Sequence, residues 1–140
     1  MQIRKILVPV DGSDYSQRAA EYAADFASLV GAEVVLLICR MSIPPILGQV
    51  AYDQARNSLV AQAEEVLEPC RRLLRERNVP FADRVLEGKV EVAIVDAADY
   101  ERCDLIIMGS RGHSELEGLL LGSVTHRVLQ MASCPVMVIR

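Results

Sequence analysis

Apolar and polar residues follow one another along this chain in blocks that predict alternating strands and helices. Four short runs are apolar almost throughout, as strands buried on both faces of a sheet are. Between them lie longer segments in which apolar residues recur every three or four positions, the spacing of an amphipathic helix. The predicted apolar strands are Ile3–Val10, Val34–Cys39, Leu105–Met108 and Val136–Ile139. This alternation predicts a parallel sheet with right-handed crossovers and helices on both faces.

Serine, glycine and proline mark the ends of the predicted helices. Ser13 or Ser16 can cap a first helix, which Gly31 should end because glycine favours the left-handed conformation found there. The three later helices are predicted over Tyr52–Arg77, Val90–Glu101 and Ser123–Ala132. Pro69 falls inside the longest of them and is expected to kink or split it.

Two segments have weaker patterns. Phe81–Leu86 is predicted as a strand at the edge of the sheet, because Asp83 and Arg84 are charges that an edge strand tolerates. Met41–Val50 contains two prolines and a glycine and has no period, so it is predicted as a loop. It is either a mobile flap or a spacer.

Length and composition narrow the class of protein. A chain of 140 residues, 51% hydrophobic, fits one domain over 1–140 that buries its own core. Val34–Cys39 is the longest wholly apolar run and is too short to cross a bilayer. No apolar signal region precedes Ile3. We therefore expect a cytoplasmic protein without a membrane partner. The net charge of −4 argues against nucleic acid as a partner. The four cysteines lie about thirty residues apart and do not have metal-site spacing.

The candidate chemistry lies in Met108–Thr125, where a buried strand leads through glycines into a helix start. Gly109, Gly112 and Gly122 allow close approach of the backbone, and a helix N-terminus after such a loop favours an anion. The pattern therefore indicates a nucleotide site, although it contains neither a Walker loop nor a dinucleotide fingerprint. The alternative is that these glycines form turns and Ser123 caps the last helix.

The expected position of the two strand ends that carry glycines supports a ligand site. In doubly wound sheets, ligands bind beyond the carboxyl ends of strands at the point where the strand order reverses. If the order is 3-2-1-4-5, the segments Pro9–Ser13 and Met108–Gly112 border one crevice.

Four segments together resemble the ATP-binding branch of the universal stress protein family. They are Val-Pro-Val-Asp-Gly-Ser at 8–13, Asp-Leu-Ile-Ile-Met-Gly at 104–109, Gly-x2-Gly-x9-Gly-Ser at 109–123 and Cys-Pro-Val-Met-Val at 134–138. The match runs through the whole chain in order. It implies a three-layer, doubly wound α/β fold with a five-stranded parallel sheet of order 3-2-1-4-5, and ATP as ligand.

The resemblance also implies roles for particular residues. It places Pro9, Val10 and Asp11 by adenine and ribose, Cys39 beside the base, Met108 and Gly109 near the ribose, and Gly112, Gly122, Ser123, Val124 and Thr125 at the phosphates. Asp11 has the alternative role of capping the first helix. Cys39 stands where many relatives have Val, and Val90 stands where Pro is frequent. Arg111 and His113 are left outside the predicted site, since a loop arginine or histidine is usually just solvated. His126 is left out because it is expected on the outer side of the start of the last helix.

Three functions remain open at this point. The first is an ATP-binding stress or regulatory protein in which nucleotide modulates a dimeric surface. The second is a slow ATP- or AMP-processing enzyme of the nucleotide-binding alpha-hydrolase type, for which Asp11 is the one carboxylate placed to reach Mg²⁺. The third is a dimeric interaction protein without nucleotide. Val136–Ile139 is expected to pair with a second copy in a homodimer, because it is an uncharged edge.

Overall fold

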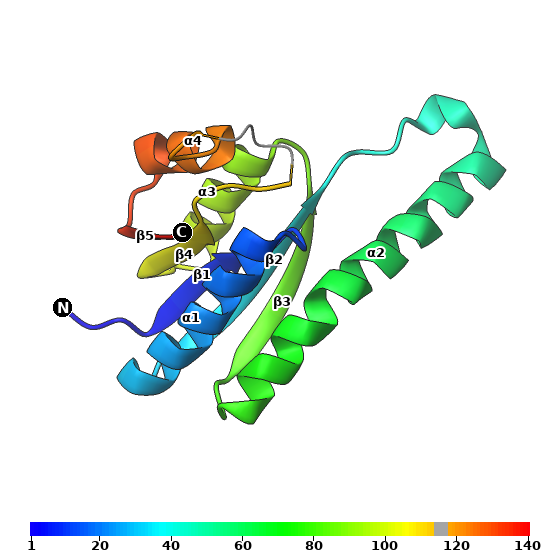
Figure 1. The fold of residues 1–140 in the computed structure, drawn as a ribbon. Helices are drawn as coiled ribbons and strands as arrows, with labels where there is room; N and C mark the ends of the chain where they lie inside the picture. Colours follow the sequence, from blue (N-terminus) through cyan, green and yellow to red (C-terminus); the bar gives the residue numbers. More distant parts are fainter. Residues whose placement is uncertain (114–117) are drawn as a thin grey trace.

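The protein is a five-stranded parallel sheet with helices on both faces, described for residues 1–113 and 118–140 by a computed structural model (Figure 1). The strand order is β3-β2-β1-β4-β5, which confirms the predicted topology. The strands are β1 (Lys5–Pro9), β2 (Glu33–Arg40), β3 (Phe81–Glu87), β4 (Leu105–Gly109) and β5 (Val136–Ile139). The helices are α1 (Asp14–Val30), the 3-10 helix η1 (Pro45–Leu47), α2 (Gln49–Glu76), α3 (Val90–Tyr100) and α4 (Ser123–Met131).

The core consists of two apolar layers that the sheet separates. Ile6 of β1 and Ile107 of β4 belong to the layer covered by α1 and α2, whereas Leu7 and Ile106 belong to the layer covered by α3 and α4. All four of these side chains are fully buried. Successive side chains of a strand point to opposite faces of the sheet. Because helices cover both faces, every residue in the middle of β1 and β4 must be apolar.

Local chemistry sets both ends of α1 as predicted. The Ser13 hydroxyl accepts a hydrogen bond of 3.2 Å from the backbone N–H of Ser16, so Ser13 is the N-cap. Gly31 follows the last turn with φ of 74°, and its N–H donates to the Ala27 carbonyl at 2.9 Å.

Two predictions about the segment between β2 and β3 were wrong in part. Met41–Val50 is not simply a loop, because η1 lies within it and α2 begins at Gln49. In addition, α2 is not split at Pro69. Pro69 is exposed and lacks an N–H for the carbonyl of Glu65, whose side chain is also exposed. On this exposed side of α2, water can donate a hydrogen bond to the Glu65 carbonyl in place of the missing N–H, so the helix continues.

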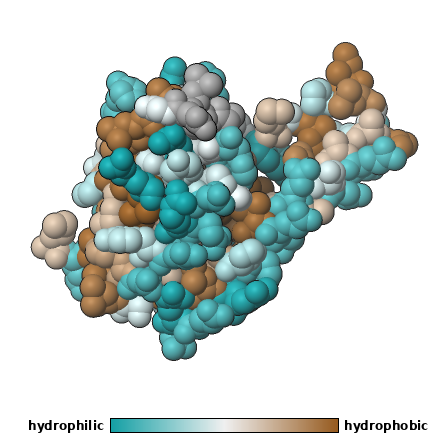
Figure 2. Space-filling view, viewed as in Figure 1, coloured by the Kyte–Doolittle hydropathy of each residue, from teal (hydrophilic) through white to brown (hydrophobic). Residues whose placement is uncertain are grey.

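The first part of α2 extends, with η1, past the end of the sheet (Figure 1). The tip of this arm is apolar on the surface (Figure 2), where Ile46 is 91% and Val50 72% exposed. By contrast, the later part of α2 buries Leu67 and Leu74 in the core. One helix is therefore anchored at one end and free at the other.

Nothing in 1–113 or 118–140 forms a helix with the length and apolar character needed to cross a lipid bilayer.

Candidate nucleotide site

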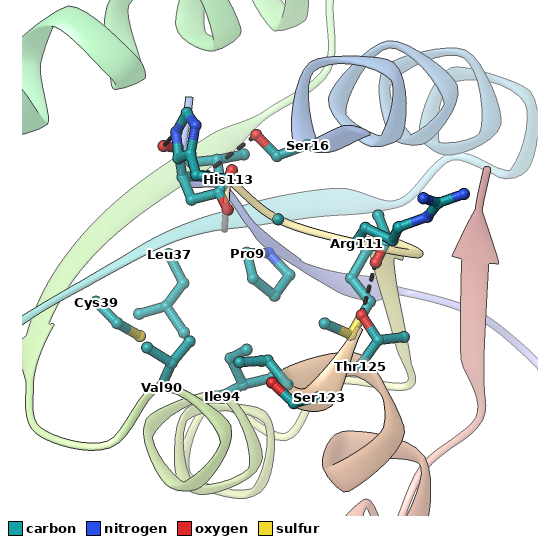
Figure 3. A pocket seen from close by; sticks show the side chains of 16 residues that line it. Pro9, Ser16, Leu37, Cys39, Val90, Ile94, Arg111, His113, Ser123 and Thr125 are labelled. Carbon is teal, nitrogen blue, oxygen red and sulfur yellow. Dashed lines mark hydrogen bonds between the residues drawn. The ribbon is translucent and has the colours of Figure 1, made fainter. Parts of the chain in front are cut away.

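A cavity of about 270 Å³ lies at the carboxyl ends of β1, β2 and β4 (Figure 3). This is close to the lower end of the size range of small-molecule sites, roughly 300 Å³. It lies where the strand order reverses, between β1 and β4. All predicted site residues except Gly122 line it, namely Pro9, Val10, Asp11, Cys39, Met108, Gly109, Gly112, Ser123, Val124 and Thr125.

One end of the cavity is apolar and was only partly predicted. Leu37 and Cys39 of β2 and Val90 and Ile94 of α3 lie around it (Figure 3). Leu37, Val90 and Ile94 were missed. A signal for them exists, because Leu37 shares a strand face with Cys39 and residues four apart on a helix share one side. Together they form a wall suited to a flat apolar group.

Cys39 contributes to that wall as a neutral thiol. Its side chain is half-buried and free of any disulfide. Burial raises its pKa to about 11, because a thiolate is poorly solvated there. At neutral pH the group is therefore protonated, a poor metal ligand and a poor nucleophile.

The opposite end is formed by the start of α4 and the glycine-rich stretch. Ser123, Val124 and Thr125 form the first turn of α4 and line the cavity, so the positive end of the helix dipole faces it. The Thr125 hydroxyl donates to the Gly109 carbonyl at 2.9 Å and is buried. This bond holds α4 against the end of β4.

Gly122, the remaining predicted site residue, does not line the cavity. It is the N-cap of α4, is buried, and donates its N–H to the Ser110 carbonyl at 2.7 Å. The helix therefore begins without a side-chain cap, and the alternative in which Ser123 caps it is wrong. Residues 114–117, in the middle of the glycine-rich stretch, lie outside the described residues.

The two glycines near β4 are needed for different reasons. A Cβ on Gly109 would lie 2.9 Å from the backbone carbonyl carbon and the Cβ of Tyr15, so glycine lets α1 pack on β4. A Cβ on Gly112 would lie 2.9 Å from the Asp11 carboxylate oxygen Oδ2, which is the end of a movable side chain. Gly109 therefore has a packing role whatever the cavity holds.

Asp11 shapes the turn after β1 and does not cap α1. Its carboxylate accepts the N–H of Ser13 at 2.9 Å, and its own N–H donates to the hydroxyl of Ser16 at 3.2 Å. The side chain is exposed at the edge of the cavity. Within the described ranges, no three His, Cys, Asp or Glu side chains are grouped as a metal site would require.

Two basic residues that were left outside the predicted site line the cavity. His113 lies beside the turn after β1, with its Nε2 atom 2.6 Å from the Asp11 carbonyl oxygen. Arg111 has its guanidinium carbon 5.3 Å from the centre of the Tyr15 ring, and its charged end points away from the cavity (Figure 3). His126, also left out, is exposed on α4 and does not line the cavity.

Comparison with known proteins shows the family of this chain and agrees with its fold. The model of the universal stress protein family matches residues 2–140. The chain belongs to the universal stress protein family. A universal stress protein of Thermus aquaticus is 35% identical over 138 residues, which are 98% of this chain and 98% of that protein.

Solved structures of universal stress proteins have the same fold. UspA from Lactobacillus plantarum matches with a TM-score of 0.89 and 26% identity over 100% of this chain and 99% of that one. A universal stress protein from Archaeoglobus fulgidus, solved in complex with dAMP, matches with a TM-score of 0.72 over 100% of both chains. At 24% identity, this second likeness shows the fold alone.

The two glycines give a first test of this geometry. We expect Gly109→Ala to lower the free energy of unfolding by about 1–3 kcal/mol, because the new methyl group would overlap the backbone of Tyr15. Gly112→Ala is the matched control and should cost less than about 1 kcal/mol, since only the Asp11 carboxylate must move. Urea denaturation of both variants measures this. Equal losses would show that Gly109 is not a packing glycine.

Proposed function

We propose that this universal stress protein binds an adenine nucleotide, with ATP as the expected ligand. The single observation behind the proposal is one cavity with an apolar wall at one end and a helix N-terminus at the other. The apolar wall suits a base, because the flat faces of a base are poorly hydrated. The helix N-terminus suits phosphate oxygens, because its N–H groups and the helix dipole stabilise negative charge.

We infer the orientation of the nucleotide from the wall and the helix. The base lies against Leu37, Cys39 and Ile94, and the phosphates lie at the first turn of α4. That turn contains no acidic residue to repel them. Mg²⁺ would enter with ATP, and Asp11 is the carboxylate on the cavity that could reach it. The dAMP held by the Archaeoglobus fulgidus protein supports this ligand class for the fold.

The nucleotide is proposed to act through a dimeric surface on β5. The N–H of Ser110, which starts the glycine-rich loop, donates to the carbonyl of Ile139 in β5 at 2.8 Å. A change at the phosphates therefore has a direct hydrogen-bonded route to the edge of the sheet. This gives the protein a regulatory role in which the ligand alters a surface that another chain contacts.

The backbone of β5 is suited to pairing with a second copy. Its four side chains are half-buried, and the strand is at the edge of the sheet. The carbonyls of Pro135 and Ile139 accept from β4, so the alternate residues Val136 and Val138 direct their N–H and C=O groups outward. An antiparallel partner strand would satisfy those groups about a two-fold axis.

The placement of the phosphates can be tested on α4. We expect calorimetry to show ATP binding by the unaltered protein, and Ser123→Ala to weaken it about fivefold through loss of one hydrogen bond of ~1 kcal/mol. His126→Ala, on the same helix but away from the cavity, should bind normally. No heat of binding with the unaltered protein would refute nucleotide binding. Normal binding by Ser123→Ala would refute only the placement.

The placement of the base can be tested through the cysteines. Saturating ATP should slow alkylation of Cys39, because the base covers it, while buried Cys70 and Cys103 stay unchanged. Cys134 is half-buried like Cys39 but lies outside the cavity, so it serves as the matched thiol. Alkylation of Cys39 should be slow at pH 8 and rise with pH, since its pKa is raised to about 11 and the thiolate reacts. Peptide mass spectrometry measures each site; ATP-independent labelling of Cys39 would exclude this orientation.

The dimer can be tested at one outward-facing residue. Val138→Pro removes an N–H that points away from β4, so the sheet keeps its own bonds while the outer edge loses a donor. Light scattering after size-exclusion chromatography should show a dimer for the unaltered protein and a monomer for the variant at tens of micromolar. A monomeric parent protein, or a dimer that withstands the substitution, would contradict pairing through β5.

A further inference from the structure

His113 connects the two loops that border the cavity. Its Nε2 atom is 2.6 Å from the Asp11 carbonyl oxygen. A carbonyl oxygen can only accept, so this nitrogen carries the hydrogen and donates. His113 follows β4 through the glycine-rich stretch and Asp11 follows β1, so the bond spans the crevice between neighbouring strands.

The bond lies at the solvent end of the cavity. His113, Asp11 and Gly12 are all exposed, although the first two also line the cavity. Gly12 has φ of 83°, and a Cβ there would lie 3.6 Å from the His113 Nε2 atom and 3.1 Å from Val66. A Cβ on Gly112 would likewise lie 2.9 Å from the Asp11 carboxylate, so the two loops lie close together beside the hydrogen bond.

The inner end of the same loop is held far more firmly. The Gly122 N–H donates to the Ser110 carbonyl, and the buried hydroxyl of Thr125 donates to the Gly109 carbonyl. Buried hydrogen bonds open only with larger unfolding, whereas exposed ones open locally at low cost. Among the described residues we therefore expect the His113 bond to open before those at the inner end.

We propose that His113 is a positioning residue whose hydrogen bond to Asp11 holds the two loops together over a bound nucleotide and slows its release. The proposal rests on the nucleotide binding proposed above. The imidazole acts through the Asp11 backbone. It adds His113, a variable position between the glycines of the Gly-x2-Gly-x9-Gly-Ser pattern, as a determinant of how long the ligand stays.

Two substitutions separate the hydrogen bond from the bulk of the side chain. His113→Ala removes the donor. His113→Gln keeps an N–H donor at nearly the same distance from the backbone. His126→Ala removes the other histidine of the chain, which does not line the cavity, and is the control.

The decisive measurement is the dissociation rate of a fluorescent ATP analogue, chased with excess ATP in stopped flow. We expect His113→Ala to release it roughly three- to tenfold faster, the effect of one hydrogen bond. The association rate should not fall, and His113→Gln and His126→Ala should release it at nearly the parent rate. An unchanged rate in His113→Ala overturns the proposal, and so does a His113→Gln variant that releases as fast as His113→Ala.

Hydrogen exchange of the ligand-free proteins tests the contact independently of binding. In His113→Ala, amides of residues 11–13 and 111–113 should exchange faster, with α3 unchanged. If the parent protein binds no analogue but His113→Ala still exchanges faster than the parent, nucleotide binding is wrong and the loop contact is right. If exchange is also unchanged, the contact itself is refuted.

Discussion

The burial of β1 and β4 on both faces is the constraint on which the rest of the molecule depends. Strands with helices above and below them must be apolar throughout, so they have no place for a polar site along their length. Polar and flexible residues can appear only where these strands end. The reversal of strand order between β1 and β4 then leaves a gap at one such end, because the two connections leave in opposite directions.

Much of this could be predicted from the sequence because burial leaves a pattern. The residues that end β1 and β4 could be assigned to one crevice once the strand order was given by resemblance to a known family. The missed apolar residues lie on elements whose sequence pattern indicates burial but not which neighbour each side chain contacts. Val90 and Ile94 look like ordinary core positions of a helix, and only the placement of α3 over the end of β2 turns their side towards the cavity.

The structural roles of individual glycines and prolines were the hardest to predict from the sequence, because each residue type has several roles. Gly109 and Gly112 look alike in the sequence, yet one is required by the backbone of Tyr15 and the other lies against a side chain. Pro45 starts a short 3-10 helix, and Pro69 continues a long one on its exposed side. Which use applies is decided by neighbours distant in sequence or by access to water. The same holds for His113, whose partner is 102 residues away.

The shape of α2 has a mechanical consequence. Its 28 residues form a rod of about 42 Å, held to the sheet only near its later half. Val66, close to the anchored part, lies beside the turn after β1, since a Cβ on Gly12 would be 3.1 Å from it, and Val50 at the free end is about 24 Å away along the rod. A tilt of about 5° at the anchor would move the apolar tip by about 2 Å on this geometry. A small displacement of the turn that tilted α2 would therefore be larger at the tip.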